Sequence, residues 1–247
     1  MRLTVIGEKY RGELNVGFRR GHLRHRNSRG HCAGVAGLPR RASQTRAYYG
    51  GLRDQYEAGK PLWVTETADA ACSGNPWAAT FLDSLRYVDQ LGRLAREEVQ
   101  AVAHNTLVAS DYGWLNDTDF TPKPNYWAAL LWHRLMGPTV LDSGVPIQQG
   151  QHLYAHGQPG TPVGLSLLAI NNDRTGTRAV HLPAVSDTDR FTLAADHLEA
   201  RTVNLNGHPL SPGLGDALLR LSGAPTAPDE LTLVPATITF LTIPGRG

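Results

Sequence analysis

The residue pattern of this 247-residue chain changes type at Gly137-Pro138, and the change limits the folds available to it. Before it, from Ser43 to Met136, helical and extended patterns alternate in the order helix, strand, helix, strand, helix. After it, short segments, often alternating polar and apolar, are separated by Gly, Pro, Asn and Asp clusters. The first pattern is typical of a parallel sheet covered by helices, and the second of an antiparallel sandwich. The sequence therefore predicts a mixed α/β unit followed by an all-β unit.

Within the α/β unit, the sequence predicts three helices and two strands. The helices cover residues 43–56, with Ser43 as the N-cap, then 76–96 and 124–136; the strands cover residues 62–67 and 99–108. Apolar residues at three- and four-residue spacing mark the second helix, and Pro124 opens the third. Such alternation is a part of a (β/α)₈ barrel or of a doubly wound sheet, and it is not a complete one.

The all-β unit is predicted over residues 139–247 as an antiparallel β-sandwich. Asn206-Gly207 predicts a tight turn, and residues 209–228 a long surface loop. The eight predicted strands cover residues 140–141, 152–154, 164–170, 179–182, 190–193, 202–205, 230–234 and 236–243.

Charge is unevenly divided along the chain. Residues 1–46 contain eleven Lys or Arg and two Glu, whereas the remainder contains thirteen basic and twenty acidic residues. Because no apolar periodicity runs from Phe18 to Pro39, residues 1–42 are predicted to be a basic segment that is disordered or poorly formed. Binding to nucleic acid or another polyanion is the alternative. No aromatic residue interleaves the arginines between Arg19 and Arg41, so we expect no nucleic-acid partner.

The remaining compositional signals argue against several classes of site. The residues His22, His25, His31 and Cys32 match no standard zinc spacing, so neither a metal nor a cofactor is expected. Cys32 and Cys72 give no disulfide framework, although a single bridge stays open. No apolar run is long enough for a membrane span, and the N-terminus has too few apolar residues for a signal peptide. The cellular compartment is therefore left open.

Glu66 is the first candidate for chemistry. It lies at the end of the short apolar run Leu62-Trp-Val-Thr-Glu-Thr67, which predicts a buried strand. Barrel enzymes place catalytic groups at the C-terminal ends of parallel strands, but a lone glutamate there is more often a solvated loop residue. Asn105, on the next strand, either orients a substrate hydroxyl or satisfies backbone groups at the strand end. The pattern alone leaves these alternatives open.

Four stretches in order resemble the heparanase and β-glucuronidase group, the family 79 glycoside hydrolases. The resemblance covers about residues 43–247 and corresponds to the C-terminal portion of that family. The stretches are Leu62-Trp-Val-Thr-Glu-Thr67, Asn105-Thr-Leu-Val-Ala-Ser-Asp-Tyr-Gly113, Pro122-Lys-Pro-Asn-Tyr-Trp-Ala-Ala-Leu-Leu-Trp132 with Arg134-Leu-Met-Gly137, and Val203-Asn-Leu-Asn-Gly207.

The resemblance implies the last βα units of an incomplete (β/α)₈ barrel over residues 43–138 and a β-sandwich over residues 139–247. It implies retaining hydrolysis of a glycosidic bond to a uronic acid, so that the partner is a carbohydrate. Glu66 matches the family's nucleophile at the end of the seventh barrel strand. Asp111 and Tyr112 match the segment that lines the sugar pocket.

The chain also departs from the family pattern. The family's acid/base glutamate follows an asparagine, and this sequence contains no Asn-Glu pair. His104-Asn105 stands where many members carry Arg-Gln. There is also no room for the first barrel strands, so we expect a truncated or misread chain with little activity alone. The alternative function is a non-catalytic carbohydrate-binding or accessory module with a vestigial barrel.

Overall fold

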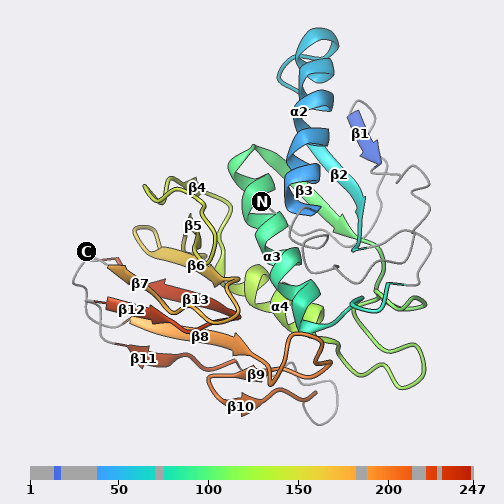
Figure 1. The fold of residues 1–247 in the computed structure, drawn as a ribbon. Coiled ribbons are helices and arrows are strands. Elements are labelled where there is room, and N and C mark those ends of the chain that lie inside the picture. Colours follow the sequence, from blue (N-terminus) through green and yellow to red (C-terminus); the bar gives the residue numbers. More distant parts are fainter. Residues whose placement is uncertain are drawn as a thin grey trace.

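The computed structural model describes residues 14–17, 38–69, 75–181, 188–212, 221–226 and 230–245. His22, His25, His31 and both cysteines lie outside the described residues. The elements form layers (Figure 1): a parallel sheet, then helices, then a large antiparallel sheet whose far face carries a small sheet. No helix in these described ranges is long and apolar enough to cross a bilayer.

The parallel sheet has the strand order β1-β2-β3. Strands β2 (Leu62–Thr67) and β3 (Val99–His104) pair in parallel, and β1 (Leu14–Gly17) pairs in parallel with the other edge of β2. Two successive βα crossovers with neighbouring parallel strands agree with the predicted barrel units. Strand β1 and the first residues of α2 lie within residues 1–42, the segment predicted to be basic and disordered or poorly formed.

Three helices connect or follow these strands: α2 (Leu38–Tyr56), α3 (Phe81–Arg96) and α4 (Pro124–Leu135). The first begins five residues before Ser43, because Pro39 is compatible with a first helical turn. The second begins five residues after the predicted start, since Ala79 has a left-handed φ of 51° and Thr80 is the N-cap. The third begins at Pro124, as predicted.

The large antiparallel sheet contains eight strands. Its order is β10-β9-β8-β13-β6-β5-β4, with β11 also paired to β8. The strands are β4 (Val140–Leu141), β5 (His152–Gly157), β6 (Leu165–Asn171), β8 (Thr188–Ala194), β9 (Asn204–Leu205), β10 (His208–Pro209), β11 (Ala224–Thr226) and β13 (Thr237–Ile243).

Two local expectations about this region have different outcomes. Asn206 and Gly207 have φ values of 50° and 82° and connect the antiparallel pair β9 and β10, which confirms the predicted tight turn. The expectation of one long surface loop over residues 209–228 is wrong, because Ala224–Thr226 forms β11 along the edge of β8.

The two faces of the large sheet are covered by different partners. A two-stranded sheet of β7 (Arg178–His181) and β12 (Glu230–Leu233) covers one face, where Val180 and Leu231 share an apolar cluster with Leu167. The other face contributes Leu168 and Phe240 to the main core, together with α3 and α4. Because side chains alternate along a strand, β5, β6 and β13 each contribute to both clusters.

Helix α3 meets the large sheet at close range. A Cβ atom on Gly92 would lie 2.5 Å from the ring of Tyr154 on β5. One helical turn earlier, the buried carboxylate of Asp89 accepts hydrogen bonds from the Tyr154 hydroxyl (2.5 Å) and Arg93 Nε (3.0 Å), and lies 2.6 Å from His152 Nδ1. These contacts join the α/β unit to the antiparallel sheet.

We predict that Gly92→Ala lowers the free energy of unfolding by about 1–3 kcal/mol, because the added methyl group forces Tyr154 or the helix to move. Urea unfolding followed by circular dichroism measures the change. Gly51→Ala on α2 is the matched control, since nothing lies within 4 Å of its Cβ position and alanine favours a helix. A Gly92→Ala variant as stable as Gly51→Ala would contradict the close contact.

We predict that Asp89→Asn lowers the free energy of unfolding at pH 7 by about 3–5 kcal/mol. Burial acts to raise the pKa of Asp89, but the hydrogen bond and charge of His152, the charge of Arg93 and the Tyr154 hydroxyl outweigh it, so the pKa is lowered. A lowered folded-state pKa stabilises the fold above the unfolded value of about 4, and this stabilisation disappears as pH falls through the folded value.

The difference between Asp89→Asn and the parent chain should therefore shrink as urea titrations move from pH 7 to below about pH 4. Asp54→Asn is the control, because its ion pair with Arg53 has a 62% exposed carboxylate side chain and contributes little. A constant difference across this pH range would show that Asp89 does not stabilise the fold through its charge.

Candidate active site

Glu66 lies at the C-terminal end of β2, as the sequence predicts. The pairing of β2 with β3 shifts register between Val64 and Thr67, which marks a bulge. As a result, consecutive side chains have different surroundings. Thr67 is buried, and its Oγ1 accepts a hydrogen bond from Gln90 Nε2 of α3 at 3.0 Å, whereas Glu66 is exposed.

Asn105 is in direct contact with Glu66. Its Nδ2 donates a hydrogen bond to Glu66 Oε1 at 2.8 Å, and its backbone N–H donates to the Thr67 carbonyl at 2.9 Å. The backbone bond continues the β2–β3 ladder by one residue, so the side-chain contact is held by the sheet. An amide donor on one carboxylate oxygen limits the rotation of the Glu66 side chain.

Asp111 and Tyr112 lie in the loop that follows β3. The sequence predicts a strand to Val108, but β3 ends at His104, so Tyr112 is eight residues beyond the strand end. The carbonyl oxygens of Ser110 and Asp111 accept hydrogen bonds from Lys123 Nζ at 3.2 and 3.1 Å. Asp111 is partly buried, and Tyr112 is only 8% exposed, which leaves a small part of its side chain accessible.

The Tyr112 carbonyl is held by His104. His104 Nε2 lies 2.9 Å from this oxygen, and the imidazole ring stacks on Trp114 with centroids 5.2 Å apart and planes 10° apart. Burial lowers the pKa of His104 to about 4, which keeps the ring neutral at physiological pH. The structure thus brings Glu66 and Asn105 together and places the Asp111-Tyr112 loop beside the same strand end.

A buried polar layer supports β2 from the side of α3. Arg86 Nε donates to Asp83 Oδ1 at 2.5 Å, and Arg86 Nη1 donates to Gln90 Oε1 at 2.7 Å. Asn125 of α4 adds a hydrogen bond to Asp83 at 2.5 Å, and Gln90 completes the connection to Thr67. The sequence patterns described above do not predict this layer. Polar residues at positions 83, 86 and 90, spaced like the apolar stripe of α3, were the available signal.

The other glutamates whose side chains the structure describes are placed elsewhere. Glu57 follows α2, and Glu97 and Glu98 precede β3, so all three lie at the N-terminal ends of the parallel strands. Glu199 lies in the segment after β8, where its Oε2 is 3.7 Å from His197 Nδ1. None of these four is seen in contact with Glu66 or Asn105 within the described ranges.

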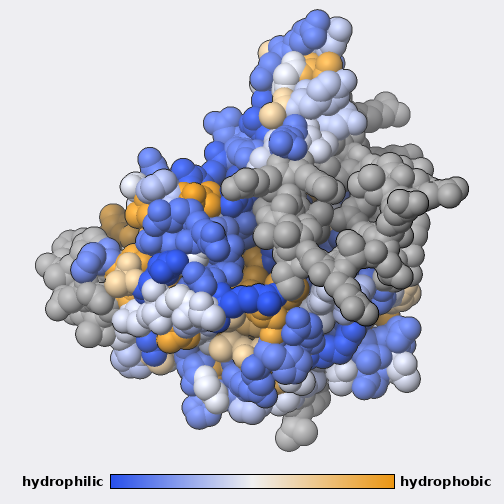
Figure 2. All heavy atoms as spheres, in the orientation of Figure 1, coloured by the Kyte–Doolittle hydropathy of each residue, from blue (hydrophilic) through white to orange (hydrophobic). Residues whose placement is uncertain are grey.

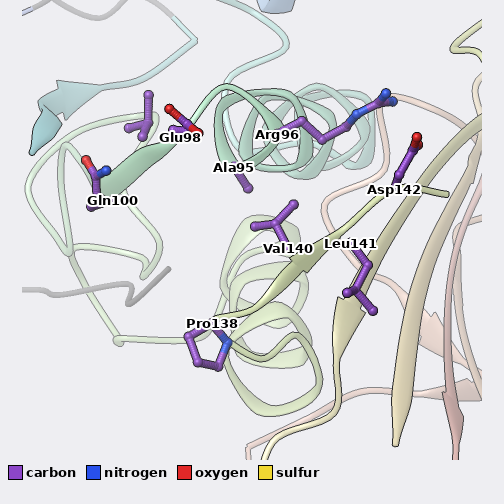
Figure 3. A pocket seen from close by; sticks show the side chains of 9 residues that line it. Ala95, Arg96, Glu98, Gln100, Pro138, Val140, Leu141 and Asp142 are labelled. Atoms are coloured by element: carbon purple, nitrogen blue, oxygen red, sulfur yellow. The ribbon is translucent and has the colours of Figure 1, made fainter. Parts of the chain in front are cut away.

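A hollow of about 730 Å³ opens at the opposite end of β3 from Glu66 (Figure 3). It lies between the end of α3, the start of β3 and the edge strand β4, with Arg96 and Asp142 on one side and Glu98 and Gln100 on the other. Among the residues coloured in Figure 2, hydrophilic ones predominate. Across the part of the chain that the structure describes, no three His, Cys, Asp or Glu side chains form a metal-binding group.

No family model matches the chain, but individual relatives do. It is 43% identical over 110 residues to heparanase-like protein 1 of Arabidopsis thaliana, covering 44% of this chain and 20% of that protein. It is 29% identical over 192 residues to baicalin-β-D-glucuronidase of Scutellaria baicalensis (74% and 36% covered), and 30% identical over 165 residues to heparanase of Rattus norvegicus (62% and 31%).

The chain thus spans between a fifth and two fifths of the length of these relatives. The resemblance to the heparanase and β-glucuronidase group is confirmed.

Solved structures show the fold. A 4-O-α-L-rhamnosyl-β-D-glucuronidase from Fusarium oxysporum 12S aligns with a TM-score of 0.62 and 16% identity, over 86% of this chain and 50% of that one. A GH51 arabinofuranosidase from Xanthomonas axonopodis pv. citri aligns with a TM-score of 0.58 and 14% identity, over 87% and 48%. These barrel glycoside hydrolases support a partial barrel joined to an antiparallel sheet.

Proposed function

We propose that this chain carries the nucleophile half of a retaining glycoside hydrolase that acts on glycosidic bonds to a uronic acid. The observation that carries the proposal is the hydrogen-bonded pair of Glu66 and Asn105 at the C-terminal ends of two neighbouring parallel strands. Barrel enzymes build their active sites at this end of the strands. The confirmed relatives include proteins named heparanase and glucuronidase, which supports the same reaction class.

In this proposal Glu66 is the nucleophile. One carboxylate oxygen attacks the anomeric carbon as the bond to the glycosidic oxygen breaks, and a covalent glycosyl ester forms. The leaving oxygen of a natural glycoside takes up a proton from an acid, which none of the described glutamates supplies beside Glu66. Water then hydrolyses the ester and returns the Glu66 carboxylate. Asn105 holds the carboxylate in one orientation, and its amide lies within reach of a sugar hydroxyl beside Glu66. Asp111 and Tyr112 contribute to the sugar pocket through the limited parts of their side chains that remain accessible.

The proposed domain division places residues 43–138 in the partial barrel and residues 139–247 in a β-sandwich. The sandwich is supported by the apolar cluster between the large sheet and the β7–β12 pair. The large sheet also packs against α3 through the Tyr154–Asp89 hydrogen bond. The proposed sandwich domain therefore stabilises the helix that packs against β2.

A non-catalytic carbohydrate-binding module is the second candidate. The observation that favours it is the placement of the described glutamates. Retaining hydrolysis requires a second carboxyl group about 5–5.5 Å from the nucleophile. Glu57, Glu97 and Glu98 lie at the opposite strand ends, and Glu199 faces His197. A chain without an acid next to Glu66 binds a glycan without cleaving an unactivated bond.

We predict that the chain hydrolyses an aryl β-glucuronide slowly or not at all, yet forms a covalent adduct with 2-deoxy-2-fluoro-β-glucuronyl fluoride. Fluoride leaves C1 as an anion without protonation, so this reagent needs the nucleophile but no acid catalyst. Intact-protein mass spectrometry should show one added glycosyl group, and peptide mapping should place it on Glu66.

Glu66→Gln should abolish the adduct, whereas Glu98→Gln, at the other end of the strands, should leave it unchanged. Glycan binding without labelling of the folded parent chain would reject the nucleophile role and favour the binding module. Hydrolysis of the aryl glucuronide that disappears in Glu66→Gln would instead show that the chain supplies its own acid.

A further inference from the structure

His104 makes contacts that take no direct part in the proposed reaction. It is the last residue of β3. Its ring stacks on Trp114 and makes a T-shaped contact with Tyr87 of α3, with ring centroids 5.2 and 5.4 Å away. Two aromatic neighbours fix both the position and the plane of the imidazole. The ring therefore presents Nε2 to one partner, the Tyr112 carbonyl at 2.9 Å.

The contact with Tyr112 defines the tautomer of His104. A carbonyl oxygen only accepts, so Nε2 must carry the proton and Nδ1 must be the unprotonated nitrogen. Nδ1 is buried without a hydrogen-bond partner in the described part of the chain. The charged groups that act on the ring are Asp83 and Arg86 of α3, whose opposing effects are smaller than that of burial, so the neutral form is favoured.

The loop after β3 is attached to its surroundings at several carbonyls. Lys123, which precedes α4, donates to the Ser110 and Asp111 carbonyls, and within the loop the Trp114 N–H donates to the Thr106 carbonyl. His104 adds the attachment of Tyr112 to the parallel sheet itself. Because His104 is followed directly by Asn105, the same strand end holds both the Glu66 partner and the Tyr112 carbonyl.

We infer that His104 is a positioning residue of the candidate active site, which holds Tyr112 in a set position relative to the Asn105–Glu66 pair. This inference rests on the proposed function for its consequence in catalysis. A direct proton-transfer role does not fit, because the ring is buried and Nε2 is already engaged with the Tyr112 carbonyl. His104 acts on the substrate through the geometry of the loop.

Two substitutions of His104 by residues of similar size separate the hydrogen bond from packing. His104→Gln places an amide N–H near the former position of Nε2, whereas His104→Met fills the space without a donor. We expect both chains to fold, as judged by urea unfolding. His104→Met should lower the second-order rate of Glu66 labelling by the fluoroglucuronyl fluoride about five- to tenfold, the effect of one lost hydrogen bond.

His104→Gln should restore labelling to within about threefold of the parent chain, since the donor is retained. Equal losses in the two folded variants would reduce His104 to a packing residue and overturn the inference. So would parent-like labelling of His104→Met. The comparison uses the full 247-residue chain with identical reagent concentrations.

A substrate-free measurement keeps the inference testable if the proposed function fails. The ¹³C chemical shift of the Tyr112 carbonyl should change in His104→Met and stay the same in His104→Gln. The ¹⁵N spectrum of the parent chain should show a neutral His104 with the proton on Nε2 at about pH 6, which is well above its lowered pKa. Absence of labelling with these signatures rejects the proposed function alone. A His104 whose Nε2 carries no proton, or an unchanged Tyr112 carbonyl in His104→Met, rejects the positioning role.

Discussion

Buried charge on α3 is the constraint on which the rest of the structure depends. One group, Asp83 and Arg86, connects through Gln90 to Thr67 at the end of β2. The other, Asp89 with Arg93, reaches Tyr154 in the antiparallel sheet. Burying a charge is costly unless it is paired and hydrogen-bonded. The elements that supply partners to the buried charges of α3 are therefore held next to the helix. The helix is therefore held in one rotation between two sheets.

This constraint extends to the candidate site. Thr67 is bound from the α3 side, and the bulge before it leaves Glu66 exposed with Asn105 as its partner. A slip of β2 by one residue would exchange the surroundings of Thr67 and Glu66, leaving an unpaired carboxylate against α3. The polar layer behind β2 thus stabilises the register that presents Glu66, although it contributes no group to the reaction.

Sequence patterns predict the elements that depend on the local spacing of apolar residues or on single turn residues. The apolar run from Leu62, the stripe of α3 and Pro124 at the start of α4 each depend on local spacing, and Asn206-Gly207 depends on the left-handed backbone that a tight turn needs. The positions of Glu66 and Asn105 follow from parallel pairing. The late start of α3 and strand β11 escape prediction, because a single φ angle decides the first and pairing with β8 decides the second.

The supporting residues of the site escape prediction for a different reason. His104 is preceded by a run of small and apolar strand residues, and no local spacing distinguishes a histidine that binds a loop carbonyl from one that fills the core. Its partner, Tyr112, is eight residues away through a loop whose path depends on Lys123 and Trp114. Three consecutive carbonyls, from Ser110 to Tyr112, are each bound by a side chain, so the loop is held at its backbone. Substitutions of the loop side chains can therefore change what it contacts while its backbone stays attached to β3.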